Sequence, residues 1–178
     1  MTAAPLVLRH PQGRPRDFVV HGKESETALS KDWDHYLFKM GEDLASVYLD
    51  LGIATAAPVA EHSYLVRISV ELLQPAENGM STDEEYQDLI ALEDDLFARL
   101  HGDKALYVGR LTTRRSRMFF LYAKDAELIT REASAVMERH PAYRHQIGIQ
   151  PDPHWGLYFD CLYPSAETYQ RIQNRRLN

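Results

Sequence analysis

A strictly alternating segment in the middle of the chain constrains the fold most. From Tyr64 to Leu72 every second residue is apolar, whereas the residues between them mix apolar, polar and charged side chains. A period of two places the apolar side chains on one face of an extended strand. The segment therefore predicts a β-strand with one buried face, which ends in the turn-forming residues 75–79.

An amphipathic helix is expected directly after this strand. Thr82 and Glu85 stand three residues apart, and so do Ser81 and Glu84. This is the spacing of a capping box. The apolar residues that follow recur at steps of three and four along one stripe: Tyr86, Leu89, Ile90, Leu96, Phe97 and Leu100. Gly102 suits the C-terminus of this helix, which we expect to end at 101–103.

The same patterns give the remaining elements of the second half. Residues 105–112 and 117–123 predict a pair of strands joined by a turn. Asp125 caps a second helix, which ends before Pro141 because proline disfavours helical backbone in the residue that precedes it. A last strand is predicted over 143–149.

The resulting order is strand, helix, strand, strand, helix, strand. This βαββαβ order is typical of a ferredoxin-like α+β fold, in which an antiparallel sheet carries both helices on one face. Residues 33–40 and 44–51 also predict two strands, joined at 41–43. We expect this N-terminal β-hairpin to extend the same sheet.

The length of 178 residues suits one domain. Proline and glycine punctuate residues 1–30, so we expect an irregular N-terminal arm there. Residues 31–164 are expected to form the single α+β domain, and residues 165–178 a C-terminal helix.

Charge and cysteine usage limit the partners and the compartment. Twenty Lys and Arg against 26 Asp and Glu give a net charge of −6, which argues against general nucleic-acid binding. A lone cysteine, Cys161, excludes an internal disulfide framework and suits a reducing compartment. No apolar stretch is long enough for a bilayer span, and the N-terminus lacks a signal-peptide pattern. We therefore expect a cytoplasmic protein without membrane association.

Glu93 occupies the most informative position. Helical rotation places it within the apolar stripe of its helix, where a carboxylate is costly unless it is paired. Arg110 or Arg67, on the sheet beneath, can supply the partner. We interpret Glu93 and Arg110 as a buried structural ion pair, with a catalytic acid as the alternative.

Other polar clusters carry weaker signals. One predicted hairpin is basic and contains Arg110, Arg114, Arg115 and Arg117. It lacks the basic-Gly-aromatic pattern of RNA-binding sheets, so a solvated turn is the first interpretation and a contact with a phosphate or an acidic partner is the second. The histidines show no metal-ligand spacing, and nucleotide-binding motifs are missing, so we predict neither a metal nor a cofactor.

Several short motifs occur together along the chain. They are Trp33 with Tyr36, 47–51, Gln74-Pro75, Asn78-Gly79, Glu93-Asp94, 107–110, 119–122, 152–155 with Tyr158, and 162–164. Over about 31–176 they resemble the bacterial family called domain of unknown function 695. That family has no established activity, so the resemblance implies no catalytic residues. Some relatives continue into a domain resembling the bacterial ribonuclease E inhibitor protein B, which acts by binding the ribonuclease.

The sequence favours a non-catalytic binding or regulatory domain that acts through contact with a protein partner. The chain shows no convergent catalytic set, and the aromatic residues of its tail look exposed. We expect a ligand groove between the N-terminal hairpin, the main sheet and this tail, lined by Trp33, Tyr107, Arg110, Trp155 and Tyr158.

Three alternatives stay open. The first is a small hydrolase-type enzyme that uses Glu93 or an Asp/His pair such as Asp152 and His154. The second is an RNA-binding sheet, which the acidic composition disfavours. A homodimer, in which a second copy is the partner, is the third.

Overall fold

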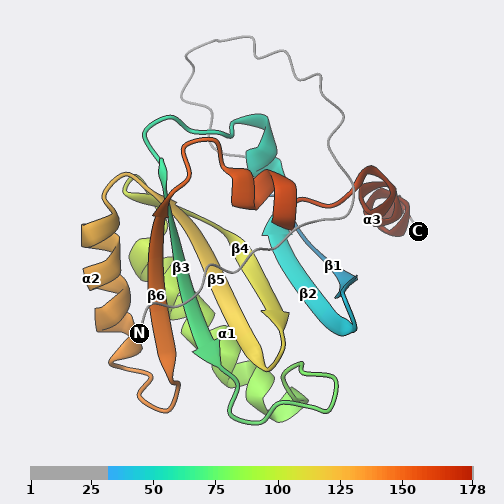
Figure 1. Ribbon diagram of the computed structural model, residues 1–178, viewed down its shortest axis with the longest axis horizontal. Coiled ribbons are helices and arrows are strands. Elements are labelled where there is room, and N and C mark those ends of the chain that lie inside the picture. Colours follow the sequence, from blue (N-terminus) through green and yellow to red (C-terminus); the bar gives the residue numbers. More distant parts are fainter. Residues whose placement is uncertain (1–31, 178) are drawn as a thin grey trace.

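Within the described residues, six strands form one sheet in which every neighbouring pair is antiparallel (Figure 1). The computed structural model describes residues 32–177. The strands are β1 (Trp33–Met40), β2 (Asp43–Asp50), β3 (Tyr64–Glu71), β4 (Ala105–Thr113), β5 (Ser116–Ala123) and β6 (His145–Pro151). Their order across the sheet is β1-β2-β4-β5-β3-β6. The predicted hairpin therefore joins the sheet at β4, as β1 and β2.

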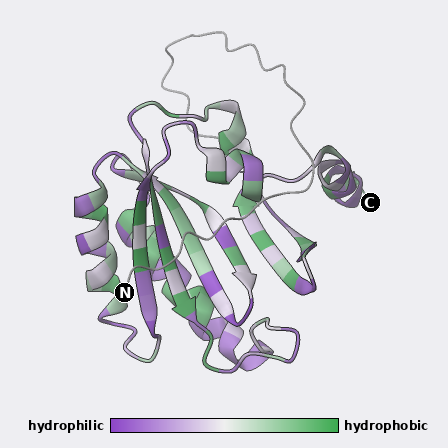
Figure 2. Cartoon of the chain, in the orientation of Figure 1, coloured by the Kyte–Doolittle hydropathy of each residue, from purple (hydrophilic) through white to green (hydrophobic). Residues whose placement is uncertain are grey.

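Each face of the sheet is covered by different elements. Two long helices, α1 (Asp83–Leu100) and α2 (Ala126–Met137), pack on one face. A 3₁₀ turn at Gly52–Thr55 and a π-helical turn at Leu157–Leu162 pack on the other (Figure 1). The C-terminal helix α3 (Ala166–Leu177) lies next to β1 and is mostly hydrophilic (Figure 2).

Side-chain caps start both long helices where the sequence predicts them. The Thr82 hydroxyl accepts a hydrogen bond from the Glu85 amide at 3.4 Å, and acidic residues fill the first turn of α1. Asp125 accepts from the Leu128 amide at 2.9 Å at the start of α2. These acceptors satisfy amide groups that have no partner within the helix, and acidic side chains there complement the helix dipole.

The mixed α and β architecture with an antiparallel sheet is confirmed, with two corrections. The last strand begins at His145 rather than 143, because Tyr143 turns inward and is buried against the helical core. The tail is not an exposed aromatic surface, since Trp155 and Tyr158 are completely buried on the face opposite the helices. The predicted N-terminal arm lies outside the described residues.

Candidate functional site

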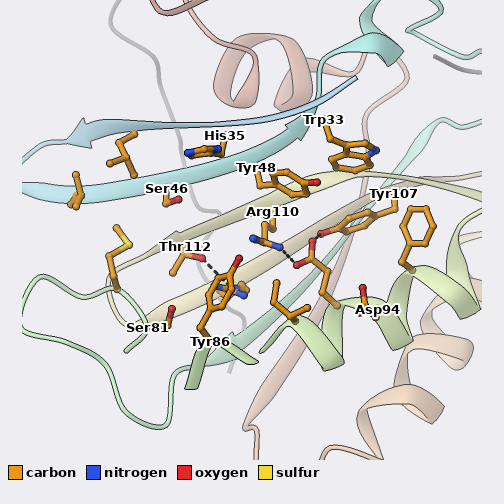
Figure 3. Close-up of a pocket in the computed structure, with 17 residues that line it drawn as sticks. Trp33, His35, Ser46, Tyr48, Ser81, Tyr86, Asp94, Tyr107, Arg110 and Thr112 are labelled. Atoms are coloured by element: carbon orange, nitrogen blue, oxygen red, sulfur yellow. Dashed lines mark hydrogen bonds and ion pairs between the residues drawn. The ribbon is translucent and has the colours of Figure 1, made fainter. Parts of the chain in front are cut away.

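A groove opens beside α1 because the sheet is wider than the helical layer that covers it. Helices α1 and α2 pack over β3, β4 and β6, whereas β1 and β2 continue past α1. The groove between them has a volume of about 830 Å³. Its floor consists of side chains from β1, β2, β4 and β5, and α1 forms one wall (Figure 3).

A β-bulge determines which side chains of β4 face this groove. Tyr107 pairs with Leu121, whereas Gly109 pairs with Phe120, so one extra residue is inserted between them. Side chains three positions apart in a regular strand point to opposite faces, but the bulge turns both Tyr107 and Arg110 toward α1. Gly109 has a φ of +153°, and a Cβ there would collide with the backbone carbonyl of Tyr48. The bulge therefore requires glycine.

Glu93 on α1 joins Arg110 and Tyr107 in one network. Arg110 Nη1 forms an ion pair with Glu93 Oε2, and the Tyr107 hydroxyl donates to Glu93 Oε1 at 2.8 Å. Burial raises the pKa of the Tyr107 hydroxyl, which therefore stays a donor at neutral pH. Burial, and next the charge of Arg117, lower the pKa of Arg110 to about 10, so its guanidinium is still protonated at neutral pH.

Aromatic rings line the end of the groove next to this network. The Trp33 ring stacks on Tyr48, with centroids 5.1 Å apart, and on Tyr107 at 5.7 Å. The Arg110 guanidinium carbon lies 4.7 Å from the centroid of the Tyr48 ring, a cation–π distance. This arrangement gives the groove a flat apolar wall directly beside a positive charge (Figure 3).

Arg117 is the second cation of the groove and is only 3% exposed. Its Nε donates to Thr112 Oγ1 at 3.0 Å, and its guanidinium carbon lies 5.8 Å from the centroid of the Tyr86 ring. Its Nη1 finds no hydrogen-bond partner within the described part of the chain. Burial lowers the pKa of Arg117, because water no longer solvates the charged form.

The predicted basic hairpin divides into two parts. Arg114 lies in the turn between β4 and β5, is exposed, and pairs with Asp43 at 2.6 Å. Arg110 and Arg117 instead point into the groove. The sequence analysis identified these arginines as one basic hairpin. It did not show that some of them face the groove and others face solvent, because this depends on strand register and on the bulge.

The structure brings together three of the five predicted lining residues. Trp33, Tyr107 and Arg110 line the groove, whereas Trp155 and Tyr158 lie in the core on the opposite face. Trp155 stacks on Tyr122 at 3.9 Å. Its Nε1 donates to the His62 carbonyl at 2.9 Å. These two residues therefore do not share a groove with the other three.

Two groove residues that sequence reasoning missed are Tyr48 and Tyr86. Tyr48 lies opposite Arg110 in the β2–β4 register, and Tyr86 lies in the first turns of α1 next to Arg117. Tyr48 follows Leu44 and Ser46 at steps of two, so the β2 alternation already indicated that these residues share a face. Which face that is depends on how β2 pairs with β4.

The Asp152 and His154 pair of the sequence analysis is not assembled as a catalytic pair. Asp152 accepts hydrogen bonds from the Tyr122 hydroxyl at 2.7 Å, the Gly156 amide at 2.7 Å and the Leu157 amide at 3.0 Å. His154 is exposed. The Asp152 carboxylate thus anchors the turn that carries Trp155.

Between residues 32 and 177, no three His, Cys, Asp or Glu side chains gather closely enough to hold a metal ion. Over the same residues, every helix is too short or too polar to cross a bilayer.

Comparison with known proteins places the chain in a family. Neither the curated proteins nor the solved structures contain a match to this chain. A family model, described as a family of unknown function (DUF695), matches residues 31–163. These residues include β1–β6, both long helices and the whole groove. The chain belongs to the DUF695 family of unknown function.

Proposed function

We propose that this protein is a non-catalytic binding domain that holds an extended segment of a partner protein in the groove between α1 and β1–β2. The observation that carries the proposal is the groove itself, which combines an aromatic wall with two arginines on its floor. Aromatic and arginine side chains are the residues that most often dominate binding at protein interfaces.

The length of the groove suits a peptide segment. Trp33, His35 and Leu37 all line it from β1, and four residue steps along a strand span about 13 Å. Tyr86 to Phe97 on α1 rise about 16 Å along the opposite wall. An extended segment of about five residues has this length.

An enzymatic function is less well supported. Glu93 is held between Arg110 and Tyr107, which leaves its oxygens occupied by structural partners. Burial raises the pKa of the Cys161 thiol to about 11, which keeps it protonated at neutral pH and weakens it as a nucleophile. Both observations favour binding over a hydrolase-type reaction.

An RNA-binding sheet is also disfavoured. RNA-binding sheets stack bases on exposed aromatic side chains. Here Phe119 and Phe120 of the central strand β5 are buried in the two cores.

A location in the cytoplasm, with a lone cysteine kept as a thiol, completes the proposal.

We also infer that β4, β5, β3 and β6 with α1 and α2 form a ferredoxin-like unit. The strand order supports this inference, because β3 and β5 lie at the centre and each helix connects two strands that have one strand between them. In this view β2 and β1 are an addition at the β4 edge. The groove lies where the addition extends past the helical layer.

The test compares captured proteins between two matched variants. Leu37 lines the groove on edge strand β1 and is 57% exposed, whereas Ile149 is 45% exposed on the opposite edge strand β6. We expect Leu37→Glu to lose a protein partner that the wild type and Ile149→Glu both capture from a host lysate treated with ribonuclease.

Three results would oppose the proposal. Capture that does not depend on Leu37 would place the binding surface elsewhere. Loss of all capture after ribonuclease treatment would favour RNA. Conversion of a dimer to a monomer by Leu37→Glu, measured by analytical ultracentrifugation, would identify a second copy of the chain as the occupant.

A further inference from the structure

We propose that the groove selects its partner by a carboxylate, and that this carboxylate of an acidic peptide side chain binds between Arg117 and Arg110. This inference rests on the proposed function and names the chemistry that the segment must carry. It predicts an acidic residue at the centre of the segment with apolar residues on both sides.

Arg117 has an unpartnered nitrogen within the described residues. A buried guanidinium N–H without an acceptor is unfavourable, because it has lost its water and gained nothing in return. Arg117 Nη1 is in this state within residues 32–177, and its side chain lines the groove. A ligand oxygen would supply the missing acceptor, and carboxylate oxygens are the strongest acceptors that a peptide offers.

Arg110 and Arg117 differ in how their charges are balanced. Arg110 is paired with Glu93, but no carboxylate in the described range forms an ion pair with Arg117. Glu85, the nearby acid on α1, already accepts hydrogen bonds from the Leu73 amide at 2.7 Å and the Gln74 amide at 2.9 Å. Asp94 is an exposed residue of the groove lining. Arg117 therefore carries a buried charge that no carboxylate of the described residues pairs with, and an anion would complement it.

Access to Arg117 depends on Tyr86. Tyr86 lies over its guanidinium and is 40% exposed, so this side chain forms the outer cover of the site. Rotation of the Tyr86 ring away from the guanidinium would uncover Arg117 on the side of the groove. The ring would then pack against the bound segment instead of the arginine.

The apolar ends of the groove distinguish a peptide from a free anion. Trp33 and Phe97 lie at one end, and Leu37, Leu44 and Met80 at the other. An inorganic anion would leave these surfaces in water. In an extended segment, residues two positions before and after the acidic residue point to the same side and reach both ends.

The experiment uses two five-residue peptides and the full chain. The probe is acetyl-Phe-Ala-Glu-Ala-Phe-amide, and the matched peptide has Gln in place of Glu. We expect isothermal titration calorimetry to show at least about tenfold tighter binding of the Glu peptide, since hydrogen bonds to charged groups typically contribute this much. This comparison uses only wild-type protein, so it stands even if a variant fails to fold.

A pair of variants then locates the site. Arg117→Met should remove the preference for Glu over Gln, whereas Arg114→Met, the same change on the same hairpin outside the groove, should keep it. Equal binding of the two peptides, no binding of either at about 1 mM, or a preference that survives Arg117→Met would each overturn the inference.

Inorganic phosphate is the third probe. Phosphate binding that depends on Arg117, without binding of the Glu peptide, would overturn the peptide and assign a free oxyanion instead. Failure of this inference is distinguishable from failure of the proposed function. A partner captured through Leu37 can bind without charge selection, and a Glu peptide can bind even if no lysate protein does.

Discussion

Trp155 on one face of the sheet and Trp33 on the other are the two tryptophans of the chain, and their surroundings differ sharply. Trp155 stacks on Tyr122 and is fully buried, and Asp152 beside it accepts three hydrogen bonds. Trp33 also stacks on a tyrosine, but it borders an open groove with a buried, unpartnered arginine nitrogen at its floor.

This difference shows how one sheet can separate stability from binding. Aromatic rings contribute most to stability where they are fully buried and their polar atoms are paired. Trp155, Tyr122 and Tyr158 meet both conditions, because each ring is fully buried and each polar ring atom is hydrogen-bonded. The groove face keeps a cavity and an unsatisfied donor, which lower stability and suit a ligand that completes them.

The largest expected effect is on the Trp155 face. Trp155→Ala should lower the free energy of unfolding by about 4 kcal/mol, because it removes a fully buried ring and leaves a cavity. Trp33→Ala should lower it by about 1.5 kcal/mol, since that ring is only partly buried. Urea unfolding measures both values, and similar losses in the two variants would contradict the division between the faces.

Glu93→Ala should have the next largest effect and lower the free energy of unfolding by about 3 kcal/mol. The substitution leaves the Arg110 guanidinium buried without its carboxylate and removes the acceptor of the Tyr107 hydroxyl. Asp94→Ala is the control, because this neighbouring carboxylate is exposed and its loss should change stability by less than about 0.5 kcal/mol. An unchanged melting temperature in Glu93→Ala would show that the ion pair contributes nothing to folding.

Arg117→Met should act in the opposite direction to Glu93→Ala. We expect the free energy of unfolding to rise by about 1 kcal/mol, because the unpartnered buried donor is replaced by an apolar side chain of similar length. Arg114→Met, in the exposed turn, should stay within about 0.5 kcal/mol of the wild type. A loss of stability in Arg117→Met would mean that its bond to Thr112 outweighs the unsatisfied nitrogen.

The smallest effect concerns pH and belongs to the Trp155 face. Burial, and next the charge of Lys124, lower the pKa of His62 below its usual value of 6.5. As pH falls below 6.5, His62 binds a proton in the unfolded chain but stays neutral in the folded protein. The free energy of unfolding therefore decreases until the pH reaches the pKa of His62 in the folded state. The His62→Gln variant should lose this component of the pH dependence in urea unfolding. Identical pH profiles for variant and wild type would contradict it.

Local patterns were sufficient to predict most of the elements. The alternation of β3 and the cap at Thr82 both concern residues that are close in sequence, so their spacing alone predicts the structure. The expectation that Glu93 needs a partner also follows from one helix, because its position in the apolar stripe is fixed by rotation. The structure supplies that partner as Arg110.

Contacts between distant segments account for what the sequence did not reveal. The aromatic residues around Trp155 looked exposed, because the sequence does not show that 152–162 folds back over the sheet. Period-two counting likewise places Tyr107 and Arg110 on opposite faces, and only the bulge at Gly109 reverses this. The open groove itself depends on β1–β2 extending past α1, a property of the whole sheet.

The bulge in β4 makes the site sensitive to changes in length rather than in composition. If an insertion added one residue between Gly109 and Arg110, Tyr107 and Arg110 would no longer share a face. With Tyr107 held in place, Arg110 and Thr112 would then enter the core now filled by Leu111, and Leu111 would face the groove. Deletion of Val108 would instead remove the bulge and keep Tyr107 and Arg110 on one face, because they would then lie two positions apart.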